Sequence, residues 1–203
     1  MNWKIWFRKK FPTHVERKIL KKLKGRTLDL GCGKGLFLYY CRNDGIEIFG
    51  VDCDKMTVRA AKKLSEKRVF LSDALNLGFK NNTFDNIVSL DVLEHVKNPE
   101  QMLKEVKRIL KPGGRLYLHV PRMNSVFGVR KDHLTLFSKQ SLEEMVKKYF
   151  KIEELESVGF RLFIRPPIIP PPYNPFWVLS TFVVQKLPEF LSTHYYVNAK
   201  NSG

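Results

Sequence analysis

The strongest signal for the fold is the stretch Leu28-Asp29-Leu30-Gly31-Cys32-Gly33-Lys34-Gly35. Its apolar first half predicts a short buried strand, and its second half predicts a glycine-rich turn. The apolar spacing of residues 35–42 then predicts a helix. A strand, a glycine turn and a helix in this order bring bare backbone N–H groups and a helix N-terminus to a ligand. We therefore expect a ligand site at Gly31–Gly35.

Outward from this unit, strand and helix patterns alternate along most of the chain. The predicted strands are Thr27–Gly31, Ile46–Asp52, Arg68–Ser72, Phe84–Leu90, Arg115–Val120 and Lys151–Ser157. The predicted helices are His14–Leu23, Gly35–Arg42, Lys55–Lys63, Pro99–Leu110 and Lys139–Tyr149. This alternation predicts an α/β fold, a doubly wound and mostly parallel sheet with helices on both faces.

The composition narrows the class of protein and of partner. With 43% apolar and 28% charged residues, the chain is typical of a globular protein. The net charge of +16 favours anionic partners such as nucleic acid, acidic lipid or a phosphorylated substrate, although a solvated basic surface explains it equally well. Cys32, Cys41 and Cys53 lack the spacing of metal ligands, which argues against zinc ribbons and iron–sulfur clusters and favours reduced thiols in the cytoplasm.

Acidic residues follow the predicted second and third strands, at the edge where the glycine turn lies. In an open parallel sheet, ligands bind beyond the carboxyl ends of the strands, where the strand order reverses. Asp52 ends the second strand and can accept both hydroxyls of a ribose, whereas Asp73 follows the third strand and can accept from an adenine amino group. Together with the glycine turn, these residues predict an adenosine site.

The spacing of the glycines decides between two adenosine ligands. A dinucleotide fingerprint reads G-x-G-x-x-G, but here Leu36 occupies the place of the third glycine. Asp29 would be unfavourable beside a pyrophosphate and suits a cationic amino group, such as that of the methionine part of S-adenosylmethionine. The alternative for Asp29 is a carboxylate that caps neighbouring N–H groups.

Longer motifs extend this interpretation over roughly residues 20–160. The chain resembles the class I S-adenosylmethionine-dependent methyltransferases, in particular their type 11 small-molecule group. The motifs that carry the resemblance are LDLGCGKG (28–35), FGVDCD (49–54), SDA (72–74), TFDNIVSLDVLEHVKNPEQMLKEVKRILKPGGRLYLHVP (83–121) and DHLTLFSKQSLEEMV (132–146). The resemblance implies a Rossmann-like seven-stranded sheet with one antiparallel strand, for which Thr193–Ala199 is the candidate.

The resemblance also implies roles for individual residues toward S-adenosylmethionine. The backbone at the glycine turn would line the methionine and ribose, Asp52 would hold the ribose hydroxyls, and Leu90 would contact the cofactor through its backbone. Cys53, Asp73 and Ala74 would surround the adenine. The expected cofactor-binding residues are therefore Asp29, Gly31, Cys32, Gly33, Gly35, Asp52, Cys53, Asp73, Ala74 and Leu90.

Methyl transfer is an in-line displacement, which needs a general base only when the acceptor holds its proton tightly. We predict His133 as that catalytic base, because the neighbouring Asp132 would orient its ring on the loop that covers the acceptor. His95 would instead close the turn after the fourth strand together with Glu94, and His119 would be a satisfied core histidine. No metal ligands are predicted.

Both ends of the chain could contact a larger partner. Met1–Phe11 interleaves aromatic and basic residues, which suits a lipid surface, stacked bases or a helix that caps the acceptor pocket. Phe176–Val184 is apolar but too short to span a bilayer, so we expect a lid or an interfacial anchor. We expect one domain over residues 1–203: an N-terminal cap at 1–24, a cofactor-binding core at 25–160, and a lid with a closing strand at 161–203.

Three functions follow from these observations. The first is S-adenosylmethionine-dependent methyl transfer to an O, N or C atom of a small acceptor, either hydrophobic or anionic. The second is methylation of RNA, which the net charge favours although no RNA-binding module is recognisable. The third is cofactor binding without turnover. For each we expect a cytoplasmic protein, with peripheral membrane contact through either end as an open alternative.

Overall fold

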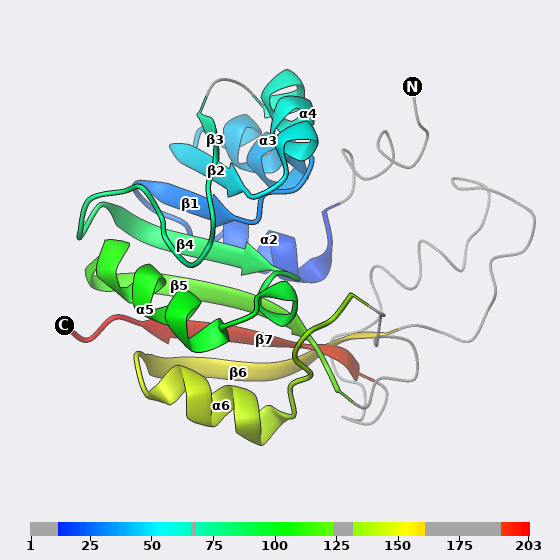
Figure 1. Ribbon diagram of the computed structural model, residues 1–203, viewed down its shortest axis with the longest axis vertical. Coiled ribbons are helices and arrows are strands. Elements are labelled where there is room, and N and C mark those ends of the chain that lie inside the picture. Colours follow the sequence, from blue (N-terminus) through cyan, green and yellow to red (C-terminus); the bar gives the residue numbers. More distant parts are fainter. Residues whose placement is uncertain (1–11, 66–67, 124–131, 161–191) are drawn as a thin grey trace, which may run out of the picture.

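The computed structural model describes residues 12–65, 68–123, 132–160 and 192–203 (Figure 1). The aromatic segment Met1–Phe11 and the apolar segment Phe176–Val184, for which the sequence predicts contacts, lie outside the described residues. So does most of the predicted lid.

The described strands form one seven-stranded sheet in the order β3-β2-β1-β4-β5-β7-β6. Only β7 runs antiparallel to its neighbours, β5 and β6, and the other pairs are parallel. The strands are β1 (Thr27–Leu30), β2 (Ile48–Asp52), β3 (Val69–Leu71), β4 (Phe84–Leu90), β5 (Leu110–Pro121), β6 (Lys151–Phe160) and β7 (Ser192–Lys200). The predicted doubly wound sheet with one antiparallel closing strand is confirmed.

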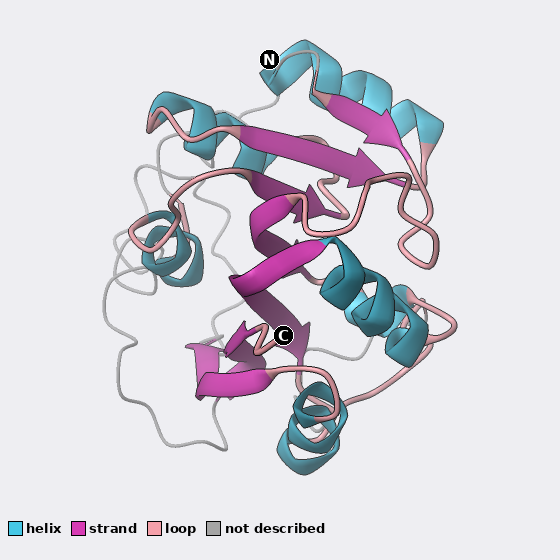
Figure 2. Cartoon of the chain, turned by 90° about the vertical axis from the view of Figure 1, so that its left-hand side faces the viewer, coloured by secondary structure: helices cyan, strands magenta, loops and turns pink. Residues whose placement is uncertain are grey.

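The helices lie on both sides of the strands (Figure 2). They are α2 (His14–Leu20), α3 (Leu36–Asn43), α4 (Lys55–Ser65), α5 (Pro99–Ile109) and α6 (Lys139–Lys147), with the short 3₁₀ turn η1 at Leu93–His95. Each predicted helix is present within a few residues of its expected bounds. The largest differences are that α2 ends at Leu20 rather than Leu23, that β6 ends at Phe160 rather than Ser157, and that β5 starts at Leu110 rather than Arg115.

Successive side chains of the central strands point to opposite faces of the sheet and pack into two separate hydrophobic cores. Ile87 of β4 packs in a cluster with residues of α5 and α6, such as Met102 and Val146. Its neighbour Val88 points to the opposite face and packs in a cluster with Val15 of α2. This period of two explains why both faces of the sheet need a helical layer.

The strand order reverses at β1, whose two neighbours β2 and β4 follow it in the chain. The carboxyl ends of β1, β2, β3 and β4 therefore lie at one edge of the sheet, and the crevice next to β1 is where such sheets bind ligands. Among the described helices, none is long and apolar enough to cross a membrane.

Candidate functional site

The turn after β1 is a backbone cradle built by three glycines. Gly31, Gly33 and Gly35 have φ angles of 74°, 53° and 82°, a left-handed region that glycine enters without strain. A Cβ on Gly31 would lie 2.3 Å from Cγ2 of Val92, so the loop after β4 presses against the turn. A Cβ on Gly33 would meet nothing within 4 Å, so the turn is open at that residue. Gly35 is the N-cap of α3.

Asp52 fastens this turn to the end of β2. Its Oδ2 accepts a hydrogen bond from the N–H of Gly33 at 2.9 Å, and its Oδ1 accepts from the N–H of Asp54 at 3.0 Å. A carboxylate has about four acceptor positions, so these two bonds leave capacity for a pair of hydroxyls. The half-buried carboxylate lies next to the open side of the turn.

Asp29 lies within β1 and is 2% exposed. Its Oδ2 receives no hydrogen bond from the described residues, which gives no support to the alternative of a carboxylate that caps N–H groups. Burial, and then the negative charges of Glu16 and Asp52, raise the pKa of Asp29 to about 8. A cation at this carboxylate would relieve the cost of burying it.

The other predicted cofactor residues lie at the same edge of the sheet. Cys53 is exposed directly after β2, and Asp73 is exposed two residues beyond β3, where its Oδ1 accepts from the N–H of Leu75 at 2.9 Å. Ala74 is partly buried against the larger core, and Leu90 is the half-exposed last residue of β4. Cys32 is buried in the turn, where burial raises the pKa of its thiol. Their roles toward a cofactor stay predictions.

His95 and His133 lie together after β4, beside Asp132. Asp132 contacts His95 at two points: Nδ1 of that ring lies 2.9 Å from the backbone oxygen of Asp132 and 3.8 Å from its Oδ2. The predicted role of His133 as a base stays a prediction. His133 packs edge-to-face on His95, with 5.0 Å between ring centroids. The backbone oxygen of Glu94 accepts from the N–H groups of Leu134 and Thr135, which joins the turn after β4 to the segment before α6.

His119 was predicted to be a satisfied core histidine; its ring does have a hydrogen-bond partner, but it is not in the core. Its side chain is 17% exposed, and its Nδ1 lies 2.7 Å from Oδ1 of Asp91. Its ring also stacks on His194, with centroids 4.4 Å apart and planes at 15°. Sequence reasoning missed both partners. Asp91 could have been found, because it follows β4 as Asp52 and Asp73 follow their strands.

No metal ligands were predicted, yet the described residues contain two groups of three side chains whose possible ligand atoms lie within 4.8 Å of one another. These are Asp91, His119 and His194, and Glu94, His95 and His133. In the first group, the rings of His119 and His194 are nearly parallel. Imidazole lone pairs lie in the ring planes, so these two do not converge on one point as ligands of a single ion must.

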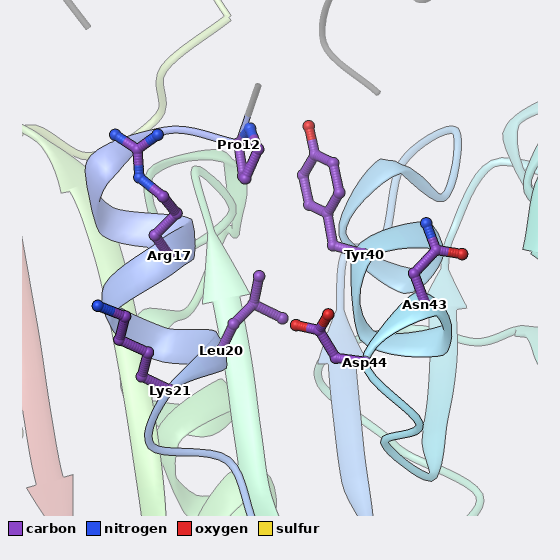
Figure 3. Close-up of a pocket in the computed structure, with 7 residues that line it drawn as sticks. All are labelled: Pro12, Arg17, Leu20, Lys21, Tyr40, Asn43 and Asp44. Atoms are coloured by element: carbon purple, nitrogen blue, oxygen red, sulfur yellow. The ribbon is translucent and has the colours of Figure 1, made fainter. Parts of the chain in front are cut away.

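A separate groove lies between α2 and α3 (Figure 3). Its volume is about 300 Å³, and Leu20 points into it from α2. Asn43 and Asp44 line it at the end of α3, which is about 12 Å along the helix axis from the glycine turn. The groove is therefore distinct from the cradle at Gly31–Gly35. Its lining residues are Pro12, Arg17, Leu20, Lys21, Tyr40, Asn43 and Asp44.

Comparison with known sequences identifies the family. Residues 28–118 match the family described as "Methyltransferase domain". The chain belongs to the class I S-adenosylmethionine-dependent methyltransferases. The chain is 34% identical over 160 residues to the Uncharacterized protein MJ0638 of Methanocaldococcus jannaschii, a match that covers 74% of this chain and 69% of that one.

It is also 30% identical over 122 residues to the Ubiquinone biosynthesis O-methyltransferase of Coxiella burnetii, which covers 55% of this chain and 49% of that protein. The chain spans about half to two thirds of the length of the first curated relatives it matches.

Solved structures show the same fold. A S-adenosylmethionine-dependent methyltransferase of Thermotoga maritima, described as a possible histamine N-methyltransferase, superposes with a TM-score of 0.69 at 22% identity, covering 98% of this chain and 94% of that one. The PH0226 protein of Pyrococcus horikoshii gives a TM-score of 0.67 at 23% identity over 92% of this chain and 87% of that one.

The cofactor of this family is S-adenosylmethionine, and the described residues fit it. The buried oxygen of Asp29 without a hydrogen-bond donor suits the cationic amino group. The open side of the turn at Gly33, with Asp52 next to it, leaves room for the ribose.

Proposed function

We propose that this methyltransferase transfers a methyl group from S-adenosylmethionine to an O, N or C atom of a small acceptor, either hydrophobic or anionic. The observation that carries the proposal is the pairing of Asp29 and Asp52 around the glycine turn. One carboxylate is buried with an oxygen that lacks a donor, and the other is fixed at the turn with acceptor capacity to spare.

In this proposal Asp29 holds the amino group and Asp52 holds the ribose hydroxyls. The backbone of Gly31, Cys32, Gly33 and Leu90 lines the cofactor, and Cys53, Asp73 and Ala74 surround the adenine. When bound, S-adenosylmethionine would supply a methyl group activated by its sulfonium sulfur, so that an aligned nucleophile can attack the methyl carbon and displace the thioether. Positioning alone can account for about 7–11 kcal/mol of the barrier in such reactions.

Two features support the proposed nature of the acceptor. Three large apolar side chains, Met123, Leu134 and Leu136, are 38%, 59% and 39% exposed. They belong to the segments that follow β5 and precede α6, and this stretch packs on Glu94 through the N–H of Leu134. Exposed apolar residues at this place suit a hydrophobic acceptor, and the net charge of +16 suits an anionic one.

The cofactor site is tested by calorimetric titration of S-adenosylmethionine into the Asp52→Ala variant. Loss of hydrogen bonds to a charged group costs about 1.5–3 kcal/mol, so we expect affinity to fall roughly ten- to a hundredfold. Asp44→Ala is the matched control, because Asp44 lies at the far end of α3. Equal affinities of Asp52→Ala and wild type would contradict the proposed site.

The acceptor is tested by transfer of a labelled methyl group to a cell extract separated into metabolite, lipid, RNA and protein fractions. We expect the label in the metabolite or lipid fraction. Label in RNA would favour the second function, and tight cofactor binding with no labelled fraction would favour binding without turnover.

A further inference from the structure

Asp91 and His119 are joined at two points at the edge of the sheet where β4 ends. The N–H of Asp91 donates to the backbone oxygen of His119 at 2.9 Å, and Nδ1 of His119 lies 2.7 Å from Oδ1 of Asp91. Asp91 has a φ of 56°, a strained value for a non-glycine residue that concentrates at functional sites. The carboxylate of Asp91 is thereby held against one nitrogen of the His119 ring.

The hydrogen bond fixes which nitrogen of His119 carries the proton. Burial raises the pKa of the Asp91 carboxyl, but the hydrogen bond from His119 opposes this effect, and the pKa of Asp91 lies below its usual value. The carboxylate is therefore ionised at neutral pH and can only accept. In the neutral ring of His119, Nδ1–H then donates to this carboxylate, and Nε2 keeps its lone pair.

His194 restrains the His119 ring from one side. Its Nδ1 lies 2.7 Å from Oγ1 of Thr193, and its Nε2 lies 3.8 Å from Oδ1 of Asp91. The rings of His194 and His119 stack with their planes at 15°, so the stacked ring of His194 opposes a rotation of the His119 ring. A base held in one orientation is what proton transfer requires.

The pair lies next to the predicted cofactor turn. Val92, the residue after Asp91, packs so closely on Gly31 that a Cβ there would come within 2.3 Å of it. His119 is paired in register with Leu90, the last residue of β4. The acceptor must approach the methyl group of the cofactor beside this turn. A base at the same edge of the sheet would therefore lie close to the bound acceptor.

We propose that Asp91 and His119 form a general-base dyad that accepts the proton of a hydroxyl group, which makes the methyl acceptor an oxygen nucleophile. The inference rests on the proposed function and narrows its acceptor class. A neutral amine already carries a free lone pair and attacks without a base, whereas a hydroxyl is a weak nucleophile until it loses its proton.

The step balances as follows. The acceptor O–H bond breaks and its proton goes to Nε2 of His119, where the charge of Asp91 stabilises the imidazolium. The acceptor oxygen forms a bond to the methyl carbon as the sulfur–carbon bond breaks, and that electron pair stays on sulfur as a neutral thioether. The proton then passes from His119 to water. Asp91 is a positioning residue in this step.

Nitrogen-15 NMR of the histidine side chains tests the dyad without an acceptor. In wild type we expect His119 as the Nδ1–H tautomer with a bare Nε2, and in Asp91→Asn we expect that preference to be lost. Asn tolerates the left-handed backbone of residue 91, so this variant should fold. His14 on α2 is the internal reference and should not change. A His119 ring protonated at Nε2 in wild type would overturn the proposal.

Calorimetry with S-adenosylmethionine separates this inference from the proposed function. We expect His119→Gln and Asp91→Asn to bind the cofactor within about twofold of wild type. If wild type does not bind S-adenosylmethionine, the proposed function is overturned. If wild type binds it but His119 is protonated at Nε2 instead of Nδ1, only the dyad is overturned.

Kinetics on the labelled acceptor fraction complete the test. We expect His119→Gln to lower kcat by about 10²–10⁴ with little change in KM for the cofactor, and to regain rate as pH rises because hydroxide replaces the base. His14→Gln is the control. The proposal would be overturned by label on nitrogen or carbon of the product, by a larger loss in His133→Gln, or by activity that EDTA abolishes and a divalent metal restores.

Discussion

At the scale of single residues, the glycine turn contains two positions that demand glycine for different reasons. Gly31 and Gly33 both have positive φ angles, so any other residue is strained at either place. Only Gly31 is also in contact with a neighbour, because its missing Cβ would lie 2.3 Å from a methyl group of Val92. The stiff branched side chain of Val92 cannot move aside without a change in rotamer.

We predict that Gly31→Ala destabilises the protein more than Gly33→Ala does. Backbone strain should cost each variant about 1–2 kcal/mol, and overpacking against Val92 should add about 1–3 kcal/mol for Gly31→Ala alone. Urea unfolding of both variants measures the difference in the free energy of unfolding. Equal losses would contradict the close contact between the turn and the loop after β4.

Asp29 gives a prediction about protons on cofactor binding. With a pKa of about 8, its carboxyl is mostly protonated at pH 7, and a cationic amino group should ionise it. We expect S-adenosylmethionine to release close to one proton at pH 7. Calorimetry in buffers with different ionisation enthalpies measures this number, and Asp29→Asn should release none. Proton release that is unchanged in Asp29→Asn would place the cation elsewhere.

The same residue makes stability depend on pH. Because the folded pKa of Asp29 is raised above its ordinary value of 3.8, the folded protein keeps a proton that the unfolded chain loses, and stability falls as pH rises from about 4 to about 8. Asp29→Asn lacks this loss. We therefore expect the free energy of unfolding of Asp29→Asn to rise relative to that of wild type between pH 4 and pH 8, by on the order of a few kcal/mol. Urea unfolding at pH 4, 6 and 8 measures this difference.

At the scale of elements, charged side chains attach α2 to the strands β6 and β7. Lys18 lies 2.6 Å from carboxylates of both Glu154 and Glu156, and Lys22 lies 2.8 Å from Glu154. The ammonium of Lys18 also lies 4.8 Å from the ring centroid of Tyr196. Thus α2, which contributes the buried Glu16 near Asp29, is attached to both β6 and β7.

We predict that Glu154→Gln lowers stability by up to about 1 kcal/mol, because it removes two partly exposed ion pairs at once. Glu143→Gln is the matched control: it removes a single i,i+4 pair with Lys147 on the surface of α6 and should cost at most about 0.5 kcal/mol. Chemical unfolding at low and at high salt measures both. A difference between the two variants that does not shrink with salt would contradict an electrostatic attachment.

At the scale of the whole molecule, the excess of 36 basic over 20 acidic residues sets the behaviour toward polyanions. We predict binding of single-stranded RNA at low salt, with an association constant that falls steeply as salt rises and with no methylation of the RNA. Filter binding over a salt series measures the slope. Heparin is the control, because it competes fully with binding that depends on charge alone.

RNA that resists heparin and takes up labelled methyl groups would instead support the second function. Peripheral membrane contact stays a proposal of the same kind. We expect anionic vesicles to retain the full chain more strongly than a chain that lacks Met1–Phe11, as measured by flotation. Equal retention would remove that segment as the lipid contact.

The sequence was sufficient to predict the order and type of the described elements. Local patterns carry that information, since a strand alternates with a period of two and a helix with 3.6. The start of β5 differed from the prediction because strand pairing decides it: Leu110 is already in register with Phe84 of β4, five residues before the predicted start. The glycines and the strand-end carboxylates were also visible, because they are consecutive or follow a strand directly.

What only the tertiary structure decided is the surroundings of the histidines. His119 was predicted to be in the core, and His194 was not considered, because 75 positions separate them in the chain. The antiparallel pairing of β7 with β5 brings them together, since Pro121 lies opposite His194. Sequence patterns report which face a side chain takes. They do not report which distant strand lies beside it, and the Asp91–His119 dyad depends on that pairing.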